Sequence, residues 1–343
     1  MMMQKQFELL RKELTDDLYA HLKETLPRQQ FVGDAYQYAV FPPGKLFRPL
    51  LVKAIACDFA PRPRFNNFDN NLFPSLFTKW HTHSNHAYLA SAIEVHHAYT
   101  LAHDDLPCMD NDSMRRNKPT THIVYGEWMA LLVGDGLLNC SYALLAKLKL
   151  ACTRDIISFV SWCLGPKGLI HGQVMDLSFE RRDKDNPVLF YELMQMLELK
   201  TSRLIQAAIV SSFAVSMAEQ REQKNSYASY GIKRSMFDLF KLGKHLGLAF
   251  QLLDDLYDLV EQKESSHEKA INAFMTYPEE AHKQLLESLN KVDHFVRKYN
   301  LQAMQLVLQE YLEKASEKLS LYNPSGAKQI LEIVRSMEHK HIV

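Results

Sequence analysis

The chain has 343 residues, of which 47% are hydrophobic and 10% aromatic, a composition ample for a buried core that excludes an intrinsically disordered protein. The 40 Lys and Arg residues balance the 40 Asp and Glu residues, which argues against a nucleic-acid-binding protein that depends on bulk positive charge. The 5 cysteines lack paired spacing, so we expect free thiols in a reducing, cytoplasmic environment.

Apolar residues recur at helical spacing along most of the chain and predict an all-α fold. The first pattern begins at Phe7 and ends at Leu22. No stretch shows the sustained alternation between turn residues that is typical of strands. Further helices are expected over 50–59, 88–103, 123–149, 187–217, 235–260, 279–299 and 301–321.

Segment 61–85 interrupts the helical pattern with prolines, asparagines and scattered aromatic residues, which indicates a loop inserted into one domain spanning 1–343. The charged start of the chain has no apolar region typical of a signal peptide, so we expect none there. Since no apolar run approaches the roughly 20 residues that a bilayer requires, the sequence predicts a cytoplasmic protein that is not an integral membrane protein.

A first cluster of aspartates follows the helix expected over 88–103, in the stretch "HDDLPCMDNDSMRR". Pro107 prevents an undisturbed helix between Asp104 and Asp110, and a broken turn would let Asp110 fold back beside Asp104. Carboxylates this crowded, with Asp105 among them, repel one another unless a cation lies between them.

A second cluster, in "AFQLLDDLYDL", lies within a predicted helix. Asp254 and Asp258 are one turn apart and share a face, and Asp255 lies one step round. Oxygen ligands without His or Cys suit Mg²⁺ or Mn²⁺, and Mg²⁺ usually shares its coordination shell with substrate phosphates. One such cluster alone would be read as a solvated helix face, whereas two shift the balance towards a diphosphate site.

Basic residues supply the other half of an anion site. Gly44, Lys45 and Arg48 lie in "PPGKLFRP" at an expected helix start, where exposed backbone N–H groups favour phosphate. Arg115 and Arg116 offer guanidinium groups suited to phosphate oxygens. Each of these residues alone would be an ordinary surface charge.

In this combination the sequence resembles the trans-isoprenyl diphosphate synthases, which include farnesyl and geranylgeranyl diphosphate synthases. "GKLFRP" resembles the family motif GKxxRP, and "EVHHAYTLAHDDLPCMDNDSMRRNKPTTH" resembles the first aspartate-rich motif. "GDGLL", "HGQVMDL", "LKTSRLI" and "AFQLLDDLYDL" follow in the family order, so the resemblance covers the chain from about Pro43 to Asp258.

The resemblance implies an isoprenoid-synthase-type helical bundle around a large central cavity, usually as a homodimer. It also implies that an allylic diphosphate, held by about three Mg²⁺ ions, loses its diphosphate to give an allylic carbocation. The double bond of isopentenyl diphosphate then attacks, and a proton is lost. Metal and Arg or Lys charge would stabilise the leaving group, and apolar walls would exclude water.

Site residues follow from the resemblance position by position. It implies that Asp104 and Asp110 bind Mg²⁺ with support from Asp105. It implies that Asp254 holds a third ion, with Asp255 and Asp258 around it. The residues that match the isopentenyl diphosphate site are Gly44, Lys45, Arg48, His97 and Arg116; those that match contacts to the allylic substrate are Arg115, Lys200, Thr201 and Gln251. Without the motif, His97 would be a satisfied helix histidine and Lys200–Thr201 an ordinary helix surface.

Chain length follows from a steric argument. The prenyl tail would run along the helix that carries the first cluster, so Tyr99 and Thr100, one turn before Asp104, would form the floor. An aromatic residue at Tyr99 resembles the farnesyl-producing arrangement, which predicts a C15 product. The alternatives are a geranylgeranyl diphosphate synthase, a class I terpene synthase, which would lack the isopentenyl site, and a non-catalytic partner subunit.

The chain departs from the family pattern after its second cluster, where the connection "LVEQKESSHEKAINAFMTYP" is shorter and lacks the usual GKxxGxD glycine pair, and at three single positions. Phe274 stands where the last lysine is expected, and Lys263 or Lys269 would have to replace it. Asn117 replaces the glycine that usually follows the arginine pair, and His171 replaces a glycine before Gln173. These departures bear on affinity for the allylic diphosphate rather than on the fold.

Overall fold

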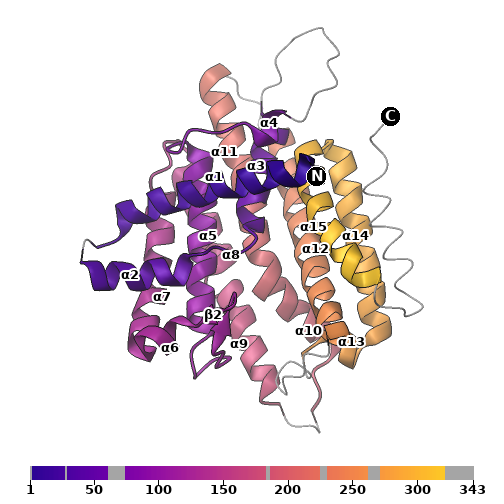
Figure 1. Cartoon of the computed structure of the whole chain (residues 1–343). Helices are drawn as coiled ribbons and strands as arrows, with labels where there is room; N and C mark the ends of the chain where they lie inside the picture. Colours follow the sequence, from indigo (N-terminus) through magenta and orange to yellow (C-terminus); the bar gives the residue numbers. More distant parts are fainter. Residues whose placement is uncertain are drawn as a thin grey trace. The chain divides into compact units, whose positions relative to one another are not determined.

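The structure is a computed structural model that describes residues 2–27, 29–60, 74–182, 186–224, 230–261 and 271–320 (Figure 1). The described residues are almost entirely helical, which confirms the all-α prediction. They divide into two compact units, one lying within Met1–Ser158 and Ser211–Ser226 and the other within Phe159–Val210 and Tyr227–Val343. The helices α8 (Thr153–Leu164) and α11 (Arg203–Lys224) contribute residues to both. The prediction of one domain over 1–343 stays a prediction.

The first unit is built around one helix that is buried on nearly all sides. Its elements are α1 (Met2–Thr25), α2 (Gln30–Val40), α3 (Phe47–Asp58), α4 (Pro74–Phe77), α5 (Asn85–Asp104), β1 (Met114–Arg115), β2 (Lys118–Pro119), α6 (Thr121–Tyr125) and α7 (Glu127–Leu145). The helix α5 packs against α1, α2, α3 and α7. Its apolar residues face every direction because neighbours surround it, and the Ser84 side chain caps its start by accepting from Ala87 N–H. The buried helix ends at Asp104, so it delivers the first aspartate cluster to one end of the unit.

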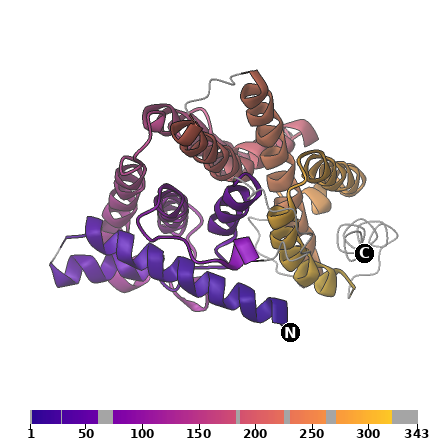
Figure 2. The same ribbon diagram turned by 90° about the horizontal axis from the view of Figure 1, so that it is seen from above.

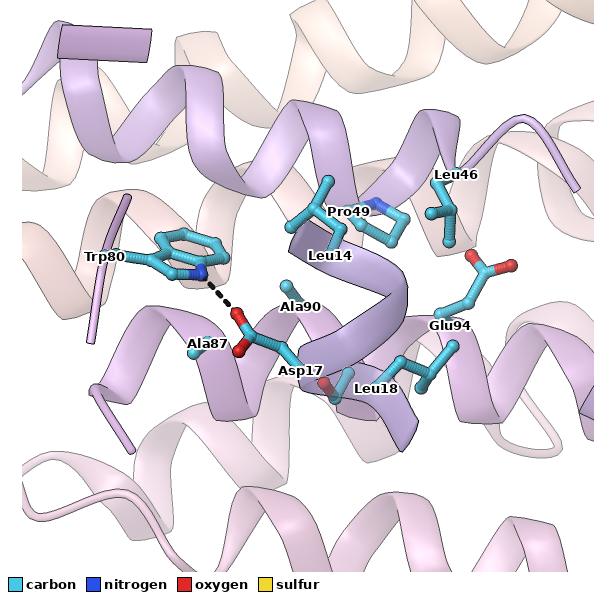
Figure 3. Close-up of a pocket in the computed structure, with 10 residues that line it drawn as sticks. Leu14, Asp17, Leu18, Leu46, Pro49, Trp80, Ala87, Ala90 and Glu94 are labelled. Carbon is cyan, nitrogen blue, oxygen red and sulfur yellow. Dashed lines mark hydrogen bonds between the residues drawn. The ribbon is translucent and has the colours of Figure 1, made fainter. Parts of the chain in front are cut away.

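The helix α1 lies along one side of the other helices of this unit (Figure 2). Its buried residues include Phe7, whose ring meets Phe77 edge to face at 5.2 Å. Polar groups also hold it: Trp80 Nε1 donates to Asp17 Oδ2 at 2.7 Å (Figure 3). Buried Lys53 pairs with Glu13 at 3.2 Å, which satisfies its charge inside the fold.

The expected insertion at 61–85 is only partly described. Residues 61–73 lie outside the described residues. The remainder contains α4, where Leu76 is buried, and a segment held by Lys53, whose ammonium donates to Thr78 O at 2.8 Å and lies 4.4 Å from the Trp80 ring. This described part of the insertion is therefore packed against α1 and α3.

The second unit is arranged along the long helix α12. Its elements are α9 (Leu169–Glu180), α10 (Phe190–Leu197), the π-helix η1 (Glu198–Ser202), α12 (Tyr230–Glu261), α13 (Ala273–Thr276), α14 (Pro278–Tyr299) and α15 (Gln302–Ser320). The helix α12 packs against α14, η1, α10, α13 and α15. It carries the second aspartate cluster near its end.

Two expected helices differ from the structure. The helix predicted over 123–149 is divided into α6 and α7 at Gly126, whose φ of 85° is a conformation that glycine adopts at little cost. The helix predicted over 187–217 consists of α10, η1 and part of α11, because a π-turn at Glu198–Ser202 changes the hydrogen-bond pattern within it. The short hairpin of β1 and β2 was not expected.

One described helix, α7, is long and apolar enough to cross a membrane by length and composition alone. Within that window 44% of the residues are buried in the fold. The helix packs against α5, α6, α2 and α1, as a core helix does. It is therefore weak evidence for a membrane span.

Candidate active site

The loop between α2 and α3 carries the predicted isopentenyl diphosphate residues Gly44 and Lys45. Leu46 precedes α3 in the left-handed conformation, with φ of 53°, and so turns the chain into the helix that bears Arg48. A Cβ atom at Gly44 would lie 3.1 Å from Arg116 Nη2. Glycine at this position therefore leaves room for the guanidinium group, as a close backbone approach requires.

Two side chains of α5, Glu94 and His97, lie one turn apart beneath these basic groups. Glu94 is 4% exposed, and its Oε1 lies 4.0 Å from Arg116 Nη2. Burial raises the pKa of Glu94, while the charges of Arg48 and Arg116 oppose that rise. Burial, reinforced by Arg48 and Arg116, lowers the pKa of His97 well below its usual value. A neutral imidazole and a buried carboxylate thus accompany the two guanidinium groups.

We call Gly44, Lys45, Arg48, His97 and Arg116, together with Glu94, the cationic cluster. The structure brings Gly44, Arg48, His97 and Arg116 together around Glu94 within the first unit, and Lys45 follows Gly44 along the chain. Sequence reasoning missed Glu94. Its signal was an acidic residue in an otherwise apolar helix, one turn before His97.

The hairpin of β1 and β2 presents the two neighbouring arginines. Arg115 pairs with Lys118 across the strands, and the two residues between them, Arg116 and Asn117, have φ of 52° and 61°. A two-residue turn with both φ values positive favours Asn or Gly. Asn117 therefore suits this turn, and its replacement of the family's glycine leaves the turn intact.

The first aspartate cluster follows the end of α5. The backbone N–H of Asp110 donates to Asp104 O at 2.9 Å, and that of Asn111 donates to Leu106 O at 3.1 Å. The chain thus leaves the helix and folds back, which confirms the predicted broken turn that brings Asp110 beside Asp104.

Asp105 occupies a different position from its neighbours. It is 3% exposed and accepts from Arg115 Nε at 2.5 Å, while Arg115 Nη2 donates to Asp112 Oδ2 at 2.7 Å. Burial raises the pKa of Asp105 to about 6, against the lowering effect of Arg115. Arg115, predicted to contact the allylic substrate, is therefore anchored between two carboxylates, which fixes its guanidinium beside the cluster.

The donor set of this cluster fits Mg²⁺. Asp104 and Asp110 offer hard carboxylate oxygens, and Mg²⁺ commonly binds through one or two carboxylates plus waters and substrate phosphates. Within the part of the chain that the structure describes, no group of three His, Cys, Asp or Glu side chains forms a complete metal site. The arrangement fits an ion shared with a diphosphate better than one enclosed by protein alone.

In the second unit, the π-helix η1 carries Lys200 and Thr201 between two glycines. A Cβ atom at Gly172 of α9 would lie 2.3 Å from Lys200 N, and one at Gly247 of α12 would lie 2.4 Å from Ser202 Cα. Glycine at both positions therefore lets α9 and α12 approach η1 closely. His171, the departure next to Gly172, is exposed.

A chain of polar contacts connects η1 to α12. Thr201 Oγ1 donates to Gln251 Oε1 at 3.0 Å, and Gln251 Nε2 donates to Asp255 Oδ1 at 3.1 Å. Lys200 forms an ion pair with Asp176 of α9, which is 2% exposed. The structure thus brings together Thr201, Gln251 and Asp255. Sequence reasoning did not assign Asp176, although it lies within "HGQVMDL".

Within the second aspartate cluster, Asp255 is buried and Asp254 and Asp258 are half-buried. Asp255 Oδ2 accepts from Ala273 N–H at 3.1 Å, and Asn272 Nδ2 donates to Asp255 O at 2.8 Å. Burial raises the pKa of Asp255 to about 7. Asp255 therefore holds the start of α13 against α12, and the more accessible Asp254 and Asp258 offer the better metal ligands.

The departure at Phe274 lies in α13, directly after these contacts. Its side chain is buried, at 8% exposure, so it acts as part of the apolar core of the second unit. The candidate replacements Lys263 and Lys269 lie outside the described residues.

The predicted chain-length residues lie on α5 before Asp104. Tyr99 is buried, and its ring meets His96 at 4.5 Å and His103 at 5.7 Å, both edge to face. Burial raises its pKa. Thr100 Oγ1 donates to His97 O at 2.8 Å, so its hydroxyl is turned back onto the helix.

The first aspartate cluster and the cationic cluster belong to the first unit; Lys200, Thr201, Gln251 and the second aspartate cluster belong to the second. That Asp104, Asp110 and Asp254 hold Mg²⁺ ions on one allylic diphosphate stays a prediction.

Comparison with known proteins identifies the family. The family model for polyprenyl synthetase matches residues 29–273. The geranylgeranyl diphosphate synthase of Cyanophora paradoxa is 32% identical over 261 residues, covering 74% of each chain. The farnesyl diphosphate synthase of Bacillus subtilis (strain 168) is 28% identical over 306 residues, covering 87% of this chain and 89% of that protein. The crystal structure of a Helicobacter pylori geranyltransferase complexed with magnesium and isoprenyl diphosphate is 26% identical, with a TM-score of 0.66 over 90% of this chain and 98% of that one. The chain therefore belongs to the polyprenyl synthetase family of prenyltransferases.

Proposed function

We propose that this protein is a short-chain trans-prenyltransferase that condenses isopentenyl diphosphate with dimethylallyl or geranyl diphosphate to give farnesyl diphosphate. The observation that carries the proposal is the cationic cluster, in which Arg48, His97 and Arg116 converge beside the first aspartate cluster. A terpene synthase, which ionises one prenyl diphosphate and cyclises it, has no need of a second diphosphate site.

The assigned roles follow from charge and position. The residues that would hold Mg²⁺ are Asp104, Asp110, Asp254 and Asp258. When bound, Mg²⁺ supplies charge that stabilises the leaving diphosphate. The magnesium and isoprenyl diphosphate in the Helicobacter pylori complex support this assignment.

The groups of this chain act on the allylic diphosphate, and the later steps take place between the two substrates. Arg115 and Lys200 bind the allylic diphosphate as its C–O bond breaks, and Thr201 and Gln251 orient it. The double bond of isopentenyl diphosphate forms the new C–C bond with the allylic carbon. The resulting cation loses a proton to the departing diphosphate, which restores a double bond.

The diphosphate group of isopentenyl diphosphate stays attached throughout, so its site must bind an anion without promoting cleavage of the C–O bond. Lys45, Arg48 and Arg116 provide charge for this purpose. His97, with its lowered pKa, is neutral and donates a single hydrogen bond. Glu94 keeps one guanidinium oriented without acting on substrate.

We propose a C15 product because the buried ring of Tyr99 would block a longer tail one turn before Asp104. Relatives include both farnesyl and geranylgeranyl diphosphate synthases, so a C20 product is the alternative. Purified protein should be incubated with isopentenyl and geranyl diphosphates and Mg²⁺, and the products sized. A mainly C20 output defeats the C15 assignment, and a Tyr99→Ala variant should lengthen the product.

The same assay separates the remaining alternatives. A terpene synthase would form cyclic hydrocarbons without isopentenyl diphosphate. A non-catalytic partner subunit would release no diphosphate when it is tested alone with Mg²⁺. Condensation that requires both substrates excludes both alternatives.

We also propose a cytoplasmic homodimer. Support for a dimer comes from apolar side chains exposed along α6 and α7, among them Ile123 at 56%, Trp128 at 62% and Leu132 at 53%. Such a patch is typical of an interaction surface. A Trp128→Glu, Leu132→Glu variant should sediment as a monomer; an unchanged sedimentation coefficient assigns the dimer to another surface.

A further inference from the structure

The hairpin that presents Arg116 also holds the loop between α2 and α3, through a residue that the proposed mechanism does not use. Lys118 Nζ donates to two carbonyl oxygens at the end of α2, Tyr38 O at 2.5 Å and Phe41 O at 2.5 Å. Its ammonium lies 3.8 Å from the centre of the Tyr38 ring. A second hydrogen bond joins the same two elements, because the Tyr38 hydroxyl donates to Pro119 O at 2.7 Å. The hairpin thus donates hydrogen bonds to the end of α2 and also accepts one from it.

These contacts act as a cap of α2. The last carbonyl groups of a helix have no partners within it, and a cation there also interacts favourably with the helix dipole. Phe41 is the C-cap residue that directly follows Val40, the last residue of α2. Because charge-assisted hydrogen bonds are about twice as strong as neutral ones, Lys118 fixes the direction in which the chain leaves the helix.

The segment that leaves α2 at Phe41 leads directly to the cationic cluster. Pro42 O accepts from Arg116 Nη1 at 3.1 Å, and Gly44 packs against the same guanidinium. Lys45 follows, and its carbonyl accepts from Arg11 Nε at 3.0 Å. A displacement of Phe41 would therefore be transmitted to Lys45 and to the start of α3.

From this geometry we infer that Lys118 is a positioning residue for the homoallylic substrate: it sets the path of residues 41–46 so that Lys45 and Arg48 meet the diphosphate of isopentenyl diphosphate. The inference rests on the proposed function and extends it to a residue that touches no substrate.

The effect should be specific to one substrate. The side chain of Arg115, on the neighbouring strand, is held by Asp105 and Asp112, whereas the ammonium group of Lys118 bonds to the end of α2. Loss of the Lys118 cap should therefore leave affinity for the allylic diphosphate intact. A general loss of stability would instead lower both affinities or the fraction of folded protein.

The matched variants are Lys118→Met and Lys147→Met in the full chain with Mg²⁺. Lys147 belongs to the same unit, pairs with Glu24 and lies 5.3 Å from the centre of the Tyr88 ring, away from the cationic cluster. Lys118→Met should raise KM for isopentenyl diphosphate about tenfold, because small displacements of a positioning group are costly. KM for the allylic substrate and kcat should change less than about twofold, and Lys147→Met should leave all three constants unchanged.

Two further measurements keep the test decisive. Lys118→Arg, which can donate to both carbonyls, should restore most of the affinity. Amide hydrogen exchange should accelerate in peptides covering 38–48 of Lys118→Met but not in those covering 85–104. If Lys118→Met folds poorly, Lys118→Gln, with a neutral amide donor, should give the same selective rise in KM to a smaller extent.

An unchanged KM for isopentenyl diphosphate in an active Lys118→Met enzyme, or equal rises for both substrates, would overturn the inference. If the wild-type protein does not condense the two substrates, the proposed function fails on its own. The exchange measurement still tests the cap in that case, since unaltered exchange over 38–48 would show that Lys118 does not fix the loop.

Discussion

Replacing Gly172 by alanine tests how closely η1 must be held. The added Cβ atom would lie 2.3 Å from Lys200 N, 2.7 Å from Leu199 C and 2.8 Å from Lys200 Cα. All three are backbone atoms, so no flexible side chain can yield. To restore ordinary contact, η1 would have to move by about 1 Å, and a 1 Å misplacement of a positioning group can cost about 100-fold in rate.

We therefore expect kcat of Gly172→Ala to fall by about 100-fold, with a loss of unfolding free energy of about 1–3 kcal/mol from overpacking. The assay is steady-state release of diphosphate, with thermal unfolding to show that the variant is folded. The control is Gly33→Ala in α2, where the nearest atom to the added Cβ is Pro27 O at 3.4 Å. Alanine in that helix should be neutral or stabilising by up to about 1 kcal/mol. A folded Gly172→Ala enzyme whose kcat is within about threefold of wild type would refute the reasoning.

Two further predictions follow from backbone conformation and from burial. Asn117→Gly should keep the wild-type KM for isopentenyl diphosphate, because glycine adopts positive φ readily. Asn117→Val places a β-branched residue at positive φ, so it should raise this KM and lower the melting temperature, at a cost of about 1–2 kcal/mol in unfolding free energy. Equal KM values for the two variants would contradict the turn assignment. Burial lowers the pKa of His96 to about 3. Below pH 6.5 the unfolded chain therefore binds a proton at His96 that the folded chain does not. The free energy of unfolding should fall as the pH drops from about 6.5 towards 3, by up to about 1.4 kcal/mol per pH unit. Denaturant unfolding at several pH values should show a shallower fall for His96→Asn, and an identical slope would place the proton elsewhere.

Much of the fold could be predicted because helical periodicity is a local property. A helix over 88–103 was expected from the spacing of its apolar residues, and its end near Asp104 follows from Pro107. The broken turn that returns Asp110 to Asp104 could also be predicted, since Pro107 removes a backbone donor. These features depend on residues within a few positions of one another.

Other features carried weak signals or none. Gly126 is a recognisable helix break, yet the apolar pattern continues on both sides of it, and one helix was predicted over 123–149. The π-turn at Glu198–Ser202 has no such marker, because it arises where Gly172 and Gly247 admit η1 between two helices. Asp255 was expected near a metal ion, and only its proximity to Ala273 reveals its role at the start of α13.

The order of the motifs, the helical class and the membership in a prenyltransferase family were determined by the sequence itself, because periodicity and motif spacing are written along the chain. The tertiary structure decided which charges meet. Glu94 lies by Arg116, Lys118 by the carbonyls of α2, and Asp176 by Lys200, all pairs far apart in sequence. Such partners emerge only on folding, since the cost of burying a charge must be offset by whichever opposite charge or dipole the fold brings within reach.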